Sequence, residues 1–227
     1  MTGGDGQGGS AVMASAPPAP DEVKASRLLA TLGVGGVVAG VLLVVAFGLT
    51  LPTIEANKAR ELAAAVNEVL RAPARYETLY VVAGALVRKV PDGADPKKVE
   101  RVYLGYRSDD QRVGFAMVSA EAGFQDFVRV IFGYDPRTKQ LLGMKVLESK
   151  ETPGLGDKIE KDRAFVSQFA EAHVPLIGVK QGKRSGPREV AMITGATISS
   201  KAVIRIINNA LQRLGPLVDR YPQEGKG

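Results

Sequence analysis

The stretch that decides the organisation of this chain is residues 28–51, LLATLGVGGVVAGVLLVVAFGLTL, which contains no charged residue. As a helix rising about 1.5 Å per residue, it would span more than the ~30 Å hydrocarbon core of a bilayer. A secretory signal peptide has a shorter apolar region and a small-residue cleavage site, but this stretch runs into Leu51-Pro52 without such a site. The stretch therefore predicts an uncleaved, single-pass transmembrane helix.

The residues that flank this stretch set its expected orientation. Lys24 and Arg27 lie directly before it, whereas the first basic residues after it are more distant. By the positive-inside tendency, residues 1–27 form a cytoplasmic tail, which is rich in Gly, Ala, Ser and Pro and is expected to be disordered. The large remainder of the chain is then expected on the periplasmic or extracellular side of a cell inner membrane.

The composition excludes several kinds of chemistry. The chain has no cysteine and one histidine, so disulfide scaffolds, thiol catalysis, cysteine-ligated metals and multi-histidine sites are ruled out. His173 is interpreted as a surface or helix-capping residue, and no catalytic residue or metal site is expected. The net charge of +6 comes from basic residues interspersed with acidic ones, without a nucleic-acid-binding motif. Any redox chemistry would need an organic cofactor, and no nucleic-acid partner is expected.

The residues after the anchor predict an α+β fold, with one β-rich domain at 52–215 and a C-terminal tail at 216–227. Strand segments rich in Val, Tyr, Phe and Leu follow a first helix, and an amphipathic helix closes the domain before Gly215-Pro216. The expected elements are helices at 53–71, 162–172 and 201–214, and strands at 79–90, 99–107, 112–119, 127–134, 140–147 and 189–193.

Two loops are the candidate functional segments. The first, Glu151-Thr152-Pro153-Gly154-Leu155-Gly156-Asp157-Lys158, has a proline and two glycines that set an irregular backbone able to approach a flat ligand. The second, Thr194-Gly195-Ala196-Thr197-Ile198-Ser199-Ser200, lies between a short strand and the last helix. Ser199 or Ser200 can cap a helix that begins near Lys201, and a helix N-terminus favours a phosphate. A capped helix without a ligand is the competing interpretation of the second loop.

Together the two loops resemble a known family. Thr194-Gly195-Ala196-Thr197 matches the Ser/Thr-Gly-Ala-Thr motif of the FMN-binding domain. That domain occurs in the G subunit of the Rnf electron-transport complex and in the C subunit of the sodium-pumping NADH:quinone reductase. The run from Ser149 to Ile159 resembles the second signature of the family, and its Asp-Lys-Ile continuation is more similar to the G subunit of Rnf.

The resemblance implies a function and a cofactor. It implies FMN joined to Thr197 through a phosphoester bond that a separate flavin transferase makes. Further cofactor-binding residues implied by the motifs are Thr194, Gly195, Ala196, Ile198, Ser199, Ser200, Glu151, Thr152, Pro153, Gly154, Leu155 and Gly156. The chain would be a membrane-anchored electron carrier in a redox-driven ion translocase, and its partners would be other membrane and redox subunits, the transferase and the lipid bilayer.

Alternatives and one departure from the family remain. The chain could be the equivalent C subunit of a quinone reductase, or a membrane-tethered flavin-binding or sensory module without electron transfer. The family often has an acidic residue three positions before the first motif threonine, where this sequence has Ala191, and the nearby Glu189 replaces it only if the strand register allows. The basic loop from Lys180 to Arg188 is either a phosphate or headgroup contact or a solvated loop.

Overall fold

The structure is a computed structural model that describes residues 24–96 and 98–221; residues 1–23 of the predicted tail and residues 222–227 lie outside these ranges. The chain divides into two compact units, Met1–Ile54 and Glu55–Gly227. The described part of the first unit is helical and belongs to α1 (Ala25–Val69), which is long and apolar enough to cross a membrane. This helix fits the membrane anchor that the sequence predicts.

Helix α1 differs from the predicted pair of helices. The sequence predicted an anchor that ends at Leu51 and a second helix at 53–71, but one helix includes Pro52 in its interior. A proline removes one backbone hydrogen bond, and the residues on both sides of it have helical patterns strong enough to continue the helix. The helix ends at Val69 because Arg71 and Ala72 adopt left-handed backbone angles, with φ of 58° and 55°.

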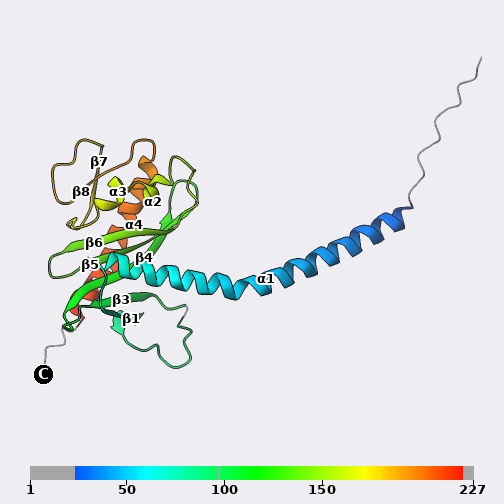
Figure 1. Cartoon of the computed structure of the whole chain (residues 1–227), viewed down its shortest axis with the longest axis horizontal. Helices are drawn as coiled ribbons and strands as arrows, with labels where there is room; N and C mark the ends of the chain where they lie inside the picture. Colours follow the sequence, from blue (N-terminus) through cyan, green and yellow to red (C-terminus); the bar gives the residue numbers. More distant parts are fainter. Residues whose placement is uncertain (1–23, 97, 222–227) are drawn as a thin grey trace, which may run out of the picture. The chain divides into compact units, whose positions relative to one another are not determined.

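The second unit is built on a six-stranded antiparallel sheet with the order β2-β1-β3-β4-β5-β6 (Figure 1). The strands are β1 (Arg75–Val82), β2 (Ala85–Val87), β3 (Arg101–Tyr106), β4 (Arg112–Ala122), β5 (Phe127–Asp135) and β6 (Gln140–Glu148). The predicted strand at 79–90 is wrong, because the chain turns at Ala83 and Gly84, both with positive φ, and β1 pairs with β2. The other sheet strands lie where the sequence predicted them, within a few residues.

Two helices pack on opposite faces of this sheet. On one face, Val66 and Val69 at the end of α1 and Leu70 just after it pack against Tyr103 and Ile131. The other face is covered by α4 (Thr197–Arg220), and its core contains the side chains that alternate with those of the first face, including Leu104, Phe115, Phe132, Val203, Ile207 and Leu214. The alternation follows the two-residue period of a strand. This layered arrangement confirms the predicted α+β class.

The connection between β6 and α4 carries the short elements. These are α2 (Lys158–Lys161), α3 (Arg163–Ser167) and the parallel pair β7 (Ile177–Val179) and β8 (Glu189–Ala191). The predicted helix at 162–172 is wrong beyond Ser167, and the chain adopts a positive φ of 69° at Glu171. Asp162 begins α3 by accepting hydrogen bonds from the N–H groups of Ala164 and Phe165.

Helix α4 is longer than predicted at both ends. It begins at Thr197 instead of near Lys201, and it continues past Gly215-Pro216 to Arg220. The predicted stop is wrong because the apolar stripe continues beyond the proline to Val218, which is 2% exposed and packs in the core. Burial of that side chain, together with the other apolar contacts of this face, offsets the cost of the proline, which includes a lost hydrogen bond and a steric clash with the preceding turn.

Candidate functional site

The first turn of α4 presents Thr197 to solvent. Gly195 adopts a φ of 86°, which allows the sharp turn from β8 into the helix, and Ala196 occupies the N-cap position. An alanine has no side-chain oxygen to accept hydrogen bonds from the first-turn N–H groups. Thr197, the first helical residue, is exposed beside these groups. The arrangement favours an anion at this end of the helix.

Ser199 and Ser200 do not cap the helix, so that prediction is wrong. Both lie inside the first turns of α4 and are buried. The Oγ of Ser200 donates to the carbonyl oxygen of Ala196 at 2.9 Å and accepts from the N–H of Ile193 at 3.1 Å. The Oγ of Ser199 donates to Oε2 of Glu151 at 2.6 Å. These hydroxyls fix the first turn of α4 to neighbouring segments.

Glu151 is a buried carboxylate, with 5% of the residue exposed. Its Oε1 accepts from the backbone N–H groups of Phe124 at 2.8 Å and Gln125 at 3.1 Å, while Oε2 accepts from Ser199. Burial by itself would raise the pKa of Glu151, but the hydrogen bonds from Ser199, Gln125 and Phe124 outweigh it and hold the pKa below its usual value. The side chain is therefore held as a carboxylate.

The two predicted loops meet in space, although the Ser199 and Glu151 that join them are 48 residues apart in sequence. Besides the Ser199–Glu151 bond, the Cδ2 of Leu155 lies 3.7 Å from the position of a Cβ on Gly195. Leu155 is 50% exposed, and Ile198 next to the motif threonine is 55% exposed. Figure 1 shows α2, α3 and the start of α4 at the same end of the domain. The site thus combines a hydroxyl, an uncapped helix end and exposed apolar side chains.

The remaining predicted residues lie around this centre. Thr194 donates through Oγ1 to Oε1 of Gln181 at 2.9 Å, and Thr152 donates through Oγ1 to Oε1 of Gln125 at 3.1 Å. Pro153 is exposed, and Gly154 adopts a φ of 76° at the turn of the loop. Both threonine hydroxyls therefore stabilise loops.

Sequence reasoning missed the turn between β4 and β5 as part of the site. Residues 123–126 carry the two N–H groups that bind Glu151, and Phe124 and Phe127 are 64% and 65% exposed. Two aromatic residues so close to a strand turn were a usable signal, because large apolar side chains in an exposed turn often mark a contact. Their common acceptor, Glu151, lies 27 residues after Phe124 and 26 after Gln125, and no local pattern indicates it.

The family's acidic position is replaced by a different contact. The backbone N–H of Ala191 donates to Oε1 of Gln168 at 2.7 Å, and Nε2 of Gln168 donates to the carbonyl oxygen of Ala191 at 3.1 Å. Oε2 of Glu189 accepts from the N–H groups of Ser185 and Gly186, so this carboxylate holds the β7–β8 loop. Those bonds engage Glu189 away from the position of Ala191.

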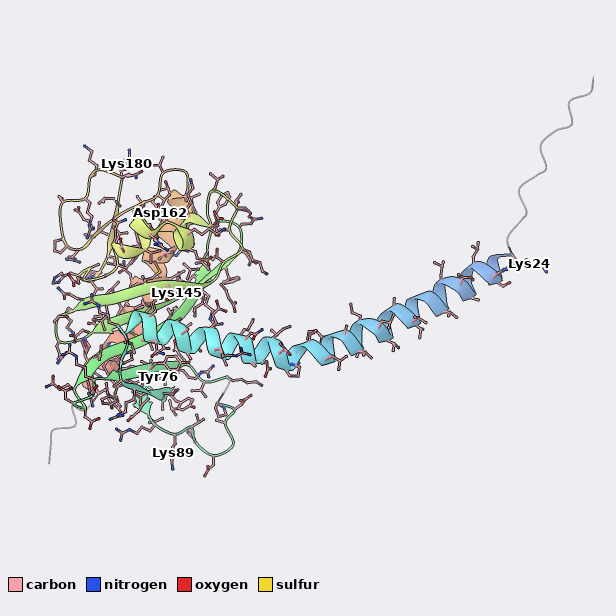
Figure 2. All side chains as sticks on the ribbon, viewed as in Figure 1. Lys24, Tyr76, Lys89, Lys145, Asp162 and Lys180 are labelled. Atoms are coloured by element: carbon pink, nitrogen blue, oxygen red, sulfur yellow. The ribbon has the colours of Figure 1, made fainter. Side chains whose placement is uncertain are left out.

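The other candidates from the sequence lie apart from these contacts. Lys180, labelled in Figure 2, begins the basic loop between β7 and β8, most of which is exposed. His173 forms a 2.8 Å hydrogen bond between its Nε2 and Nε2 of Gln140. A cleft of about 810 Å³ is lined by residues that include Tyr106, Arg112 and Tyr221, and by none from the two loops. This cleft is therefore separate from the candidate site.

Comparison with known families gives the class of domain. Residues 123–212 match the model of the FMN-binding domain family, a range that begins at Gly123 and includes both loops. The match covers the part of the chain that carries both motifs, so the resemblance found in the sequence is confirmed.

Relatives of known name narrow the class further. The chain is 28% identical to the G subunit of the ion-translocating oxidoreductase complex of Methanosarcina acetivorans, over 84% of this chain and 95% of that protein. It is 29% identical to the G subunit of the Na(+)-translocating ferredoxin:NAD(+) oxidoreductase complex of Acetobacterium woodii, over 72% and 79%. It is 33% identical to the G subunit of the ion-translocating oxidoreductase complex of Yersinia pestis, over 56% and 62%. The chain is thus similar to G subunits of ion-translocating redox complexes.

Solved structures share the fold. NqrC of Shewanella oneidensis superposes with a TM-score of 0.54 at 16% identity, over 67% of this chain and 91% of that one. The C subunit of the Na(+)-translocating NADH-quinone reductase of Parabacteroides distasonis gives a TM-score of 0.51 at 22% identity, over 67% and 80%. At these identities the likeness establishes the fold alone.

Proposed function

We propose that this protein is a membrane-anchored flavoprotein subunit of an ion-translocating electron-transport complex of the Rnf type, with FMN bound covalently to Thr197. The observation that carries the proposal is the exposed Thr197 hydroxyl at the first position of α4, with residues 151–157 folded against the same turn. Its similarity to G subunits over most of the chain supports the assignment to this type of complex. The other subunits of the complex and a flavin transferase would be its partners.

The residues at the site suit an FMN phosphate and its ring. The uncapped N–H groups at the start of α4 and the positive end of the helix dipole would stabilise the phosphate of a threonyl phosphoester. Leu155 and Ile198 offer exposed apolar surface beside the attachment point, which suits a flat ring system. Gly195 has no side chain to obstruct approach to the hydroxyl. A bound flavin supplies electron transfer that no side chain of this cysteine-free protein can perform.

The membrane anchor suits a covalent carrier. We propose that the domain after α1 faces the periplasm or exterior, since Lys24 and Arg27 flank the start of the apolar stretch. A covalent bond would keep the flavin on a domain whose compartment does not replace lost cofactor. The proposed spanning segment ends at Leu51, and its apolar side chains would contact the lipid bilayer.

The equivalent C subunit of a sodium-pumping NADH:quinone reductase is the second candidate, favoured by the fold of the two similar solved structures. Their sequence identities are lower than those of the G subunits. Electron transfer through the purified assembly, with ferredoxin or NADH as donor, separates the two candidates. A chain that holds flavin but never changes its oxidation state during turnover would instead be a binding or sensory module.

Mass spectrometry of the purified chain is the direct test of the attachment. The protein is expressed with a flavin transferase, digested, and its peptides are compared with those from cells that lack the transferase. The expected result is an FMN mass increment on the peptide that contains Thr197. An unmodified Thr197 peptide from transferase-containing cells, beside a loaded control flavoprotein, would contradict the proposal.

A further inference from the structure

Glu151 is unusual among the charged residues of the domain. It is 5% exposed, and within residues 24–96 and 98–221 it forms no ion pair with a lysine, arginine or histidine. A buried carboxylate without a cation is costly unless protein donors satisfy its oxygens. Here three donors do so, and each comes from a segment at the candidate site. The hydrogen bonds are therefore the reason that this side chain can remain buried and charged.

The three donors connect segments that are distant in sequence. Phe124 and Gln125 belong to the turn between β4 and β5, Glu151 itself begins the Pro-Gly loop, and Ser199 is the third residue of α4. Oε1 binds the turn and Oε2 binds the helix, so a single carboxylate joins all three. Ser199 is two residues from Thr197 on the same helical turn, and fixing one restricts the position of the other.

The space around this carboxylate is reserved by two glycines. A Cβ on Gly156 would lie 2.7 Å from both Cβ and Oε2 of Glu151, and 3.0 Å from Oγ of Ser199. A Cβ on Gly123 would collide with Oε1 of Glu151. Both backbone segments therefore approach the carboxylate as closely as a residue without a side chain permits. The hydrogen bonds need this close packing, because their donors must reach an enclosed side chain.

We infer that Glu151 is a positioning residue that fixes the Thr197-bearing turn of α4 through Ser199, and that it does not contact the cofactor. The inference rests on the proposed attachment of FMN to Thr197. Both oxygens of Glu151 point to protein donors, so neither is presented to a ligand. The carboxylate holds the first turn of α4 in the conformation in which a flavin transferase modifies the Thr197 hydroxyl.

The test measures the rate of covalent flavin incorporation into the full chain in membranes that contain a flavin transferase. The variants are Glu151→Ala, Glu151→Gln, Ser199→Ala and Thr197→Ala. Glu151→Ala should slow incorporation by about tenfold or more, since it leaves buried donors unsatisfied. Glu151→Gln should load flavin within about threefold of the wild-type rate. The glutamine amide oxygen can accept from the N–H groups of Phe124 and Gln125, and its NH₂ group can donate to the Oγ of Ser199.

Glu189→Ala is the matched control. Glu189 also accepts two backbone N–H groups and a serine hydroxyl, but it stabilises the β7–β8 loop. This variant should load flavin at the wild-type rate. A second readout is hydrogen exchange of the unloaded chain, in which Glu151→Ala should speed exchange at Phe124 and Gln125 and leave the amides of β5 unchanged.

Each outcome decides the inference. Wild-type incorporation in Glu151→Ala would overturn it, as would equal slowing in Glu189→Ala. Faster hydrogen exchange throughout β5 in Glu151→Ala, with no recovery of the incorporation rate in Glu151→Gln, would also overturn it. Glu151 would then have a general structural role. If Glu151→Ala does not fold, Ser199→Ala decides: slower loading supports the inference and an unchanged rate overturns it. A wild-type chain that never incorporates flavin would instead contradict the proposed function. Thr197→Ala is the negative control that separates specific attachment from background labelling.

Discussion

The two glycines of the Pro-Gly loop should respond to alanine substitution in different ways. Gly154 adopts a φ of 76°, and a Cβ there would meet no atom within 4 Å. Gly156 has no such backbone angle, but its Cβ would lie 2.7 Å from Cβ and Oε2 of Glu151. Gly154→Ala therefore introduces backbone strain, whereas Gly156→Ala introduces a steric collision with the residue that joins the site.

The structure sets the size of each effect. Gly154→Ala should lower the free energy of unfolding by about 1 kcal/mol, the cost of placing an L-residue in the left-handed region. Gly156→Ala should lower it by about 2–3 kcal/mol, because the Cβ of Glu151 cannot move without displacing the loop backbone. At roughly 2–4 °C per kcal/mol for a protein of this size, the second variant should melt several degrees below the first.

The assay is thermal unfolding of the unloaded full chain in detergent, followed by circular dichroism, together with covalent flavin loading in membranes. Gly156→Ala should lose loading because the Glu151–Ser199 bond is broken, while Gly154→Ala should load nearly as well as the wild type. Equal melting temperatures for the two variants, or full loading of Gly156→Ala, would refute the reasoning.

Three further predictions concern acid stability, the packing of α1 and the anchor. The pKa of Glu151 lies below its usual value in the folded protein, so its contribution to stability is present above about pH 4.5, the unfolded value, and is lost as the pH falls further. Melting curves between pH 7 and about pH 3 should therefore fall less steeply in Glu151→Gln than in the wild type. Gly133→Ala would drive a Cβ into the carbonyl oxygen of Val69 and should destabilise the domain by about 3 kcal/mol, whereas Gly143→Ala, with no contact closer than 3.6 Å, should be nearly neutral in denaturant unfolding. N-terminal sequencing of the membrane-extracted chain should find no start near Pro52, which would indicate cleavage of the anchor. Protease should cut the domain in right-side-out spheroplasts. Protection there, with cleavage in inverted vesicles, would contradict the proposed orientation.

The parts of the fold that the sequence predicted are those set by local pattern. The stretch at 28–51 is recognised by its length and its lack of charge. The alternating strands and the amphipathic face of α4 each show a periodicity within one segment. The errors fall at boundaries. Prolines usually break helices, but Pro52 and Pro216 each lie inside one, because favourable flanking sequence or buried apolar contacts offset the lost hydrogen bond and the steric clash.

The candidate site was predicted in part for the same reason. Both loops have compositions that indicate unusual backbone, and the residues that bring them together include two that the sequence selected, Glu151 and Ser199. Their roles were not predictable, since a serine near a helix start suggests a cap until its partner is known. Phe124 and Gln125 were missed because they join the site through backbone N–H groups, which every residue except proline carries.

The most direct test of the central claim is in-gel flavin fluorescence of the denatured wild-type chain and of Thr197→Ala, both expressed with a flavin transferase. Removal of one exposed hydroxyl should cost the fold no more than ~1 kcal/mol, so the variant should accumulate normally. Only a covalent adduct survives denaturation. The account predicts a fluorescent wild-type band and a dark band of equal protein intensity for Thr197→Ala. Fluorescence that persists unchanged in Thr197→Ala would contradict it.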